Sequence, residues 1–307
     1  MLIALAGASY QAVSNYLDSR HWPEMGRLVE ANGIKMQIHC TGRGSPTVIL
    51  EAGLGDILTE WKHLQPAIAK HTRVCSYDRA GYGRSDPGIL PRISRQIAIE
   101  LHTLLNNAGE APPFILVGHS FGGYNVRLYN ALFPNQVAGV ILVDSTQEDQ
   151  YALLPPAWKA LSVQQLKRYQ RQATWAPVFV GLGIARLTLR AQMDGILDEN
   201  AYLILQSKYV KTRASEAEFI EVSAEQARSA GSVGNKPLII LTAGKQDDSE
   251  FHRIWVNELQ PRLEGLSTHS ERIIVADSGH DMPTEKPEAI ISAVERLLRE
   301  LEQRSRN

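Results

Sequence analysis

Six short, mostly apolar runs recur along the chain and constrain its fold more than any other feature. They span residues 47–50, 73–77, 114–117, 140–143, 238–241 and 273–276. Because they lack the alternation of a half-buried strand, they predict strands buried on both faces, as in a parallel sheet covered by helices. Stretches with helical spacing lie between them, most clearly after Pro287. The pattern predicts a doubly wound α/β sheet, with any site at the carboxyl ends of its strands.

The segment 27–40 predicts an antiparallel pair ahead of these strands. Asn32-Gly33 stands between two runs, and this dipeptide is typical of a tight hairpin turn. After it, apolar and polar residues alternate up to Cys40, as in a strand.

Composition and charge exclude several classes of protein. Among 307 residues, 32 are Lys or Arg and 33 are Asp or Glu, so the net charge of −1 gives no overall field for a nucleic acid or an anionic membrane. The two cysteines cannot build a multi-bridge framework or a cysteine metal site. No metal-ligand spacing, complete dinucleotide fingerprint or P-loop occurs, so we expect no metal, no cofactor and no nucleic acid partner.

The first 22 residues have two interpretations. Residues 1–8 are apolar, but Ser9, Gln11 and Ser14 keep the run well short of the roughly 20 residues that span a bilayer. No basic residue precedes it, so we expect neither a complete signal peptide nor a stable membrane span. Residues 1–22 are an anchor stub or an arm packed on the domain, and the compartment stays open between cytoplasmic and exported or tethered.

The stretch 146–236 interrupts the alternation of strands and helices. Its apolar residues have mostly helical spacing, which predicts a helical cap inserted into a core formed by residues 23–145 and 237–307. Within it, residues 173–185 carry no charge. We expect this segment to pack against the sheet domain, to line an apolar pocket, or both.

A Gly-x-Ser-x-Gly motif follows the run 114–117 directly. Gly118, Ser120 and Gly122 form the pattern, and a helical stretch comes next. A strand that turns at once into a helix crowds the backbone, so glycines on both sides of the serine relieve the clash. The motif predicts Ser120 as a nucleophile presented at the top of the sheet.

Here the sequence resembles the α/β-hydrolase family, from about Gly26 to the final helix. Supporting motifs are Tyr77-Asp78-Arg79 with the following glycines, and Ser278-Gly279-His280. The resemblance implies the α/β-hydrolase fold, with an eight-stranded, mostly parallel sheet and a helical cap between strands six and seven. If the strand order follows the family, Cys40 and Cys75 lie on neighbouring strands, and a disulfide between them is an alternative to two free thiols.

A serine hydroxyl needs a base within hydrogen-bond reach and a third group that fixes the tautomer of that base. His280 is the candidate base, because it follows the last predicted strand. His119 lies inside the motif, and the geometry of the turn predicts that it points away from the pocket and packs inside the protein.

Two residues compete as the acid. Asp247 follows the strand 238–241, where the family most often carries its acid, and Asp144 follows the preceding strand, as in a minority branch. Each has a structural alternative as a helix cap, Asp247 with Glu250 and Asp144 with Gln147. The chain resembles a bacterial subgroup that keeps the equivalent of Asp144, so we favour Asp144. The subgroup is marked by His39-Cys40-Thr41-Gly42 and Glu51-Ala52-Gly53.

An acyl transfer also needs donors for the oxyanion. The resemblance implies the main-chain amides of Phe121 and Leu54. The expected reaction is hydrolysis of a small-molecule carboxylic ester with a hydrophobic acyl or alcohol part, through an acyl-enzyme. Amidase, lactonase or aminopeptidase activity on the same triad is an alternative, as is a binding protein that kept the fold without turnover. The sequence leaves the oligomeric state open.

Overall fold

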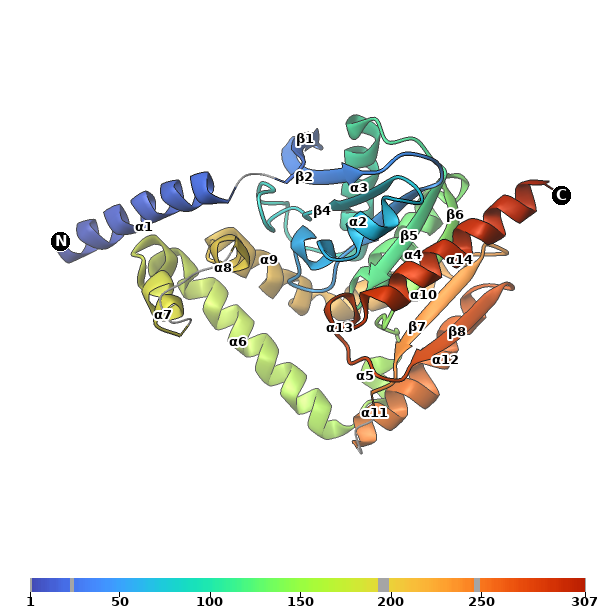
Figure 1. The fold of residues 1–307 in the computed structure, drawn as a ribbon. Coiled ribbons are helices and arrows are strands. Elements are labelled where there is room, and N and C mark those ends of the chain that lie inside the picture. The colour runs from blue at the N-terminus through green and yellow to red at the C-terminus, as the bar shows by residue number, and fades with distance from the viewer. Residues whose placement is uncertain (1, 23–24, 193–198, 246–248, 307) are drawn as a thin grey trace.

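An eight-stranded sheet forms the centre of the computed structural model, which describes residues 2–22, 25–192, 199–245 and 249–306 (Figure 1). The strands lie in the order β1-β2-β4-β3-β5-β6-β7-β8. β1 to β2 and β2 to β4 are antiparallel pairs, and the other pairs are parallel. The predicted fold class is therefore confirmed. The strands are β1 (Arg27–Ala31), β2 (Ile34–Thr41), β3 (Thr47–Glu51), β4 (Val74–Tyr77), β5 (Phe114–His119), β6 (Val137–Val143), β7 (Leu238–Ala243) and β8 (Ser270–Val275).

The central strands are buried on both faces, as their continuous apolar runs predict. Every residue of β3, β4, β5 and β7 is buried. Side chains of β5 alternate between two hydrophobic clusters, one on each face of the sheet. One face is covered by α3 (Ser94–Ala108), α4 (Gly122–Leu132) and α10 (Ile220–Ala230), and the other by α2 (Gln65–Ile68) and α14 (Pro287–Arg306). Each large aliphatic side chain buried this way contributes about 1.5–3 kcal/mol.

The hairpin at the start of the sheet forms at the predicted dipeptide. Ala31 pairs with Ile34, so Asn32 and Gly33 make a two-residue turn. Both have positive φ, 55° and 83°, as a turn that matches the twist of the strands requires. The pair extends the sheet beyond β4 without adding to the site.

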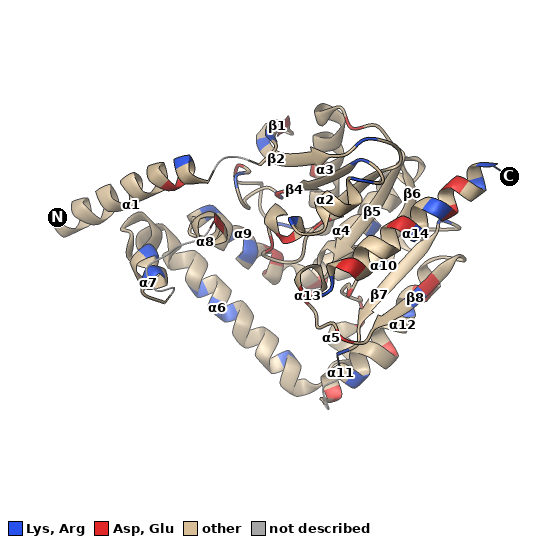
Figure 2. Ribbon diagram, in the orientation of Figure 1, with Lys and Arg blue, Asp and Glu red and all other residues tan. Residues whose placement is uncertain are grey.

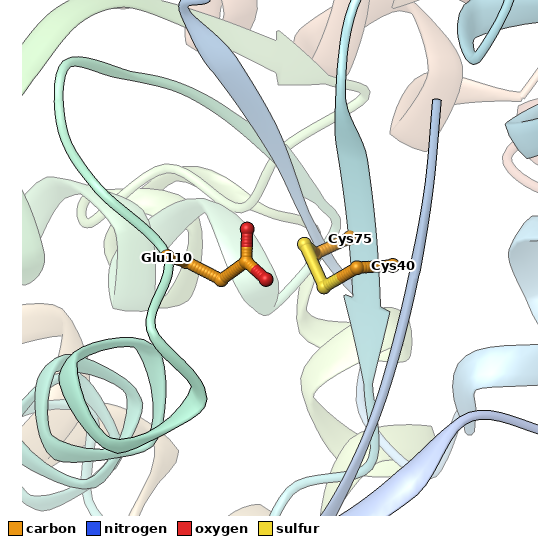
Figure 3. A group of neighbouring side chains, drawn as sticks. All are labelled: Cys40, Cys75 and Glu110. Atoms are coloured by element: carbon orange, nitrogen blue, oxygen red, sulfur yellow. A yellow bond between two sulfur atoms is a disulfide. The ribbon is translucent and has the colours of Figure 1, made fainter. Parts of the chain in front are cut away.

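A disulfide joins Cys40 of β2 to Cys75 of β4, which pair directly across the antiparallel register (Figure 3). Glu110 lies beside it and accepts a hydrogen bond from Arg73 at 2.7 Å. The two sulfurs are bonded to each other, so they cannot act as thiolate ligands for a metal.

Six helices lie between β6 and β7 in the chain, in the part of the insertion that the structure describes. They are α5 (Gln150–Leu153), α6 (Pro156–Gly181), α7 (Ile184–Gln192), α8 (Glu199–Ile204), α9 (Ser207–Glu218) and α10. Ala224 and Ala227 of α10 belong to the core cluster on the sheet, whereas α6 and α7 extend away from it (Figure 1). The domain boundaries drawn from the sequence stay predictions.

The uncharged segment 173–185 does not pack against the sheet, but its first two residues, Ala173 and Thr174, line a smaller cavity together with Leu90 and Pro91, as the second alternative expected. Trp175, Val178 and Phe179 on the last turns of α6 are exposed. The segment instead meets α1 (Leu2–His21), where Gly7 touches the backbone of Leu182. No helix in the described residues has both the length and the apolar character needed to cross a bilayer.

Three short helices complete the carboxyl-terminal part: α11 (Glu250–Ile254), α12 (Gln260–Arg262) and α13 (Met282–Glu285). A wider helical turn over Trp255–Leu259 links α11 to α12. This turn brings Trp255 to the carboxyl ends of the parallel strands, where its indole reaches Asp144 after β6.

Candidate active site

Ser120 stands in a sharp turn between the end of β5 and the start of α4. Its φ of +49° is a conformation that residues other than glycine rarely adopt. A Cβ on Gly118 would lie 2.7 Å from the carbonyl oxygen of Gly122, and one on Gly122 would lie 2.5 Å from that of Glu51. The close approach of three backbone segments therefore requires glycine at both positions.

The strained turn is held in place through the carbonyl oxygen of Ser120. It accepts hydrogen bonds from the amide and the hydroxyl of Thr146, both at 3.1 Å, and from the amide of Gly123 at 3.0 Å. Backbone strain of this kind costs about 1–3 kcal/mol and persists only when the surroundings fix it. The loop after β6 supplies that support.

The structure brings Ser120, His280 and Asp144 into one chain of hydrogen bonds. His280 Nε2 lies 2.9 Å from Ser120 Oγ, and His280 Nδ1 lies 2.6 Å from Asp144 Oδ2. The side chain of His280 is 56% exposed, whereas that of Asp144 is 3% exposed. The arrangement places a buried carboxylate behind an imidazole that faces the solvent side.

Asp144 is held on its second oxygen as well. Oδ1 accepts hydrogen bonds from the amide of Ala243 at 3.0 Å and from the indole Nε1 of Trp255 at 2.9 Å. The cap alternative for Asp144 is wrong, because α5 starts at Gln150 and this carboxylate points to the imidazole. Sequence reasoning missed Trp255, since nothing in its local pattern distinguishes it from a packing residue.

Asp247, the alternative acid, lies outside the described residues. The helix after it starts at Glu250 and is capped by Ser249, whose hydroxyl accepts a hydrogen bond from the amide of His252 at 3.0 Å. In the described residues, Ser249 thus occupies the cap position of this helix.

The two predicted oxyanion donors, the main-chain amides of Phe121 and Leu54, lie in the loops that follow β5 and β3. Phe121 directly precedes α4, where amides have no partner within the helix, and Leu54 lines the cavity beside Ser120. The Arg79 guanidinium donates hydrogen bonds to the carbonyl oxygens of Ala52 and Gly53, each at 2.7 Å. Because a trans peptide is planar, holding the carbonyl of Gly53 also fixes the direction of the Leu54 N–H.

Arg79 also ties this loop to the insertion. Its guanidinium pairs with Glu51 at 3.0 Å and with Glu216 of α9 at 2.9 and 3.0 Å, and all three side chains are buried. Tyr82 donates a further hydrogen bond to Glu216 at 2.7 Å. Sequence reasoning noted Arg79 only as part of a family motif and gave it no role.

His119 is buried on the inner side of the turn and, among the described residues, is absent from the wall of the cavity. Its Nδ1 lies 2.5 Å from Glu60 Oε1, and its Nε2 donates a hydrogen bond to the carbonyl oxygen of His280 at 2.9 Å. Burial alone lowers the pKa of His119, but the Glu60 carboxylate outweighs it and raises the pKa to about 9. This matches the prediction that His119 points away from the pocket.

Asp56 joins Glu60 and His119 in a group whose ligand atoms lie within 4.8 Å of one another. Burial, reinforced by the neighbouring Glu60, raises the pKa of Asp56 to about 7. The raised pKa of His119 gives its imidazole a positive charge beside the Glu60 carboxylate at neutral pH. The contact is therefore an ion pair inside the protein.

A cavity of about 1260 Å³ opens in front of Ser120 and His280. Three aromatic rings form part of its wall: Trp158 stacks on Phe251 at 5.9 Å, and Phe251 stacks on Trp255 at 5.8 Å. Charged residues of α6 and α10, such as Arg168 and Glu221, lie on other parts of the wall. The cavity is large enough for a drug-sized molecule.

Comparisons with known proteins agree with this architecture. The sequence model described as the alpha/beta hydrolase fold matches residues 46–176. The uncharacterized protein YqjL of Bacillus subtilis is 23% identical over 276 residues, which cover 89% of this chain and 91% of YqjL. The 2-hydroxy-6-oxo-2,4-heptadienoate hydrolase of Pseudomonas putida is 33% identical over 125 residues, 39% of this chain and 44% of that enzyme.

Solved structures extend the likeness over nearly the whole chain. A thermophilic esterase from Thermogutta terrifontis superposes with a TM-score of 0.64 at 20% identity, over 90% of this chain and 98% of that one. The strand order, the turn at Ser120 and these comparisons together lead to one conclusion: the chain has the α/β-hydrolase fold.

Proposed function

We propose that the protein is a serine hydrolase that cleaves carboxylic esters through an acyl-enzyme intermediate. The observation that carries this proposal is the chain of hydrogen bonds from Asp144 through His280 to Ser120, at 2.6 and 2.9 Å, beside a large cavity. A nucleophile, a base and a group that orients the base are the parts that acyl transfer requires.

Ser120 Oγ attacks the ester carbonyl carbon while His280 Nε2 takes the hydroxyl proton. Asp144 accepts the Nδ1 hydrogen bond and stabilises the imidazolium that forms. The carbonyl oxygen becomes negative and is bound by the amides of Phe121 and Leu54. His280 then gives the proton to the leaving alcohol. In the second half, His280 deprotonates a water molecule that attacks the acyl-enzyme, and it then gives this proton to Ser120 Oγ as the bond to the acyl group breaks, which releases the acid and restores Ser120.

The aromatic part of the cavity wall supports a substrate with an apolar acyl or alcohol group. Trp158 and Phe251 are stacked with roughly parallel rings, which offers a flat surface for such a group. Trp255 belongs both to this stack and to the hydrogen bonds of Asp144. Binding of the apolar part is therefore coupled directly to the position of the acid.

The test combines a covalent probe with a substrate panel. A fluorophosphonate should label the protein once, at Ser120, and the Ser120→Ala variant should stay unlabelled although its circular dichroism is unchanged. Para-nitrophenyl esters of graded chain length, run beside amide and lactone substrates, should show ester cleavage as the fastest reaction. A folded wild-type protein that takes up no label would overturn the serine-hydrolase proposal, and faster amide or lactone cleavage would overturn the choice of esters.

A further inference from the structure

Helix α1 has the reverse of the usual arrangement of polar and apolar residues. The stripe that faces the protein includes Gln11 and Asp18, and both bind the buried guanidinium of Arg186 on α7. Asn15 accepts another hydrogen bond from Arg186, at 2.8 Å. These three polar side chains of α1 thus bind a buried partner, on the side where a surface helix normally places apolar residues.

The apolar side chains of α1 point into solvent. Leu5, Val13 and Leu17 are 59%, 58% and 58% exposed, and Ile3 is 89% exposed. Exposing such residues together loses the free energy that their burial would provide, so a contiguous set of them marks an interaction surface.

The last turns of α6 and the start of α7 continue this surface. Trp175, Phe179 and Leu187 are 56%, 44% and 56% exposed, and α1 lies against this end of α6 (Figure 1). Eleven of the eighteen exposed large apolar side chains in the described chain belong to α1, the last turns of α6 and the start of α7. Their concentration on three adjoining helices separates this surface from the scattered apolar residues of an ordinary protein exterior.

The charge of the same three helices is strongly one-sided. They contain seven Lys or Arg residues and a single acidic residue, Asp18, which is paired with Arg186 (Figure 2). Lys167 stands about two turns before Trp175, and Arg190 donates a hydrogen bond to the hydroxyl of Tyr10 at 3.2 Å. The chain as a whole carries a net charge of −1, whereas these three helices together carry a net charge of +6, seven basic residues against one acidic residue.

We propose that α1 and the adjoining ends of α6 and α7 bind the surface of an anionic lipid bilayer. In this arrangement α1 lies in the plane of the interface, its apolar residues enter the boundary between headgroups and acyl chains, and the basic residues face the anionic headgroups. A second copy of the chain fits less well, because a symmetric contact would bring two positive surfaces together. This binding is separate from the proposed activity, since Trp175, Phe179 and the described residues of α1 and α7 are absent from the wall of the active-site cavity.

Cosedimentation with vesicles tests the proposal on the whole chain. We expect binding to vesicles of phosphatidylcholine with about 30% phosphatidylserine, little binding to phosphatidylcholine alone, and release by added salt. The variant Leu5→Gln/Val13→Gln/Leu17→Gln should bind at least about tenfold more weakly. The matched control is Ile89→Gln/Ile274→Gln, which changes exposed apolar residues elsewhere, 67% and 49% exposed, and should bind as the wild type does.

Two further measurements make the outcome decisive. Brominated lipid should quench the fluorescence of Trp175, and the contribution of this residue is the part of the quenching that is lost in Trp175→Phe. The variant Lys167→Gln/Arg20→Gln should bind anionic vesicles more weakly than the wild type. No binding to anionic vesicles, equal binding to both vesicle types, or equal loss in the control variant would overturn the proposal. So would dimerisation in analytical ultracentrifugation that Leu5→Gln/Val13→Gln/Leu17→Gln abolishes. Circular dichroism reports the folding of each variant independently of activity, so failure here is distinguishable from failure of the proposed function.

Discussion

Two histidine-carboxylate pairs lie on either side of the turn at Ser120, with ring centroids 5.0 Å apart. The outer pair is His280 with Asp144, and the inner pair is His119 with Glu60. Both place an imidazole Nδ1 against a buried carboxylate. Only the outer pair lies beside the cavity and the serine hydroxyl.

The second ring nitrogen makes the difference between the pairs. Nε2 of His280 faces Ser120 Oγ, whereas Nε2 of His119 donates to the main-chain oxygen of His280. The inner imidazole therefore has no nitrogen left for proton transfer, and it holds the backbone of the outer one. A carboxylate beside a histidine is thus insufficient to identify a catalytic base, and the partner of the other nitrogen decides.

Replacing the two histidines in turn should give the largest contrast. His280→Ala should lower kcat on a short-chain aryl ester by about 10⁶-fold, as loss of the base does in comparable triads. Steady-state kinetics measure the effect, and urea unfolding of the same sample serves as the control for folding. Similar losses of kcat in His280→Ala and His119→Gln would contradict the conclusion that only His280 serves as the catalytic base.

The acid of the outer pair is tested next. Asp144→Asn should lower kcat by about 10⁴-fold, because the imidazole is left in the wrong tautomer for accepting the serine proton. Asp247→Asn is the matched substitution in the later loop and should cost far less. The reverse ranking would show that the acid comes from the loop after β7.

The inner pair should affect stability more than catalysis. His119→Gln leaves the Glu60 carboxylate buried without its cation, which should lower the free energy of unfolding by about 3 kcal/mol. The kcat of the folded variant should stay within about tenfold of the wild type. A double variant, His119→Gln/Glu60→Gln, removes both charges and should recover much of the lost stability in urea denaturation.

The inner pair should also give a pH dependence of stability. The pKa of His119 is about 9 in the folded protein and 6.5 ordinarily, so the folded state holds a proton that the unfolded state has lost between these values. The free energy of unfolding therefore falls as pH rises from about 7 to about 9.5, and the contribution of this pair is fully present below 6.5. In Glu60→Gln this slope should be largely removed. Equal slopes in both proteins would contradict the assignment.

The sheet and the turn at Ser120 could be predicted from the sequence because their signals are local. A buried parallel strand needs a continuous apolar run, and a strand that turns directly into a helix needs glycines at fixed positions, as at Gly118 and Gly122. The hairpin at Asn32-Gly33 follows the same rule. Each of these features can be recognised within six residues of sequence.

The supporting contacts of the site could not be predicted in this way. Asp144 is held by Trp255 and by the amide of Ala243, which are 111 and 99 residues away in the chain. Glu60 and Glu216 are ordinary helix residues in the sequence, and only the packed fold brings them to His119 and Arg79. The surroundings of the uncharged end of α6 could not be predicted for a related reason, because an apolar segment does not show which element covers it. Here α1 lies against it and turns polar side chains toward the protein.

The hydrogen bonds on the carbonyl of Ser120 have a consequence for how the site moves. Thr146, which supplies two of them, stands two residues after Asp144, so the nucleophile and the proposed acid are mounted on one rigid body. His280 stands on the loop after β8, and its backbone is joined to this body by the hydrogen bond from His119 to its carbonyl oxygen. Thermal motion would therefore change the proton path mainly through that loop, and heating should first loosen the imidazole while the serine and the carboxylate keep their spacing.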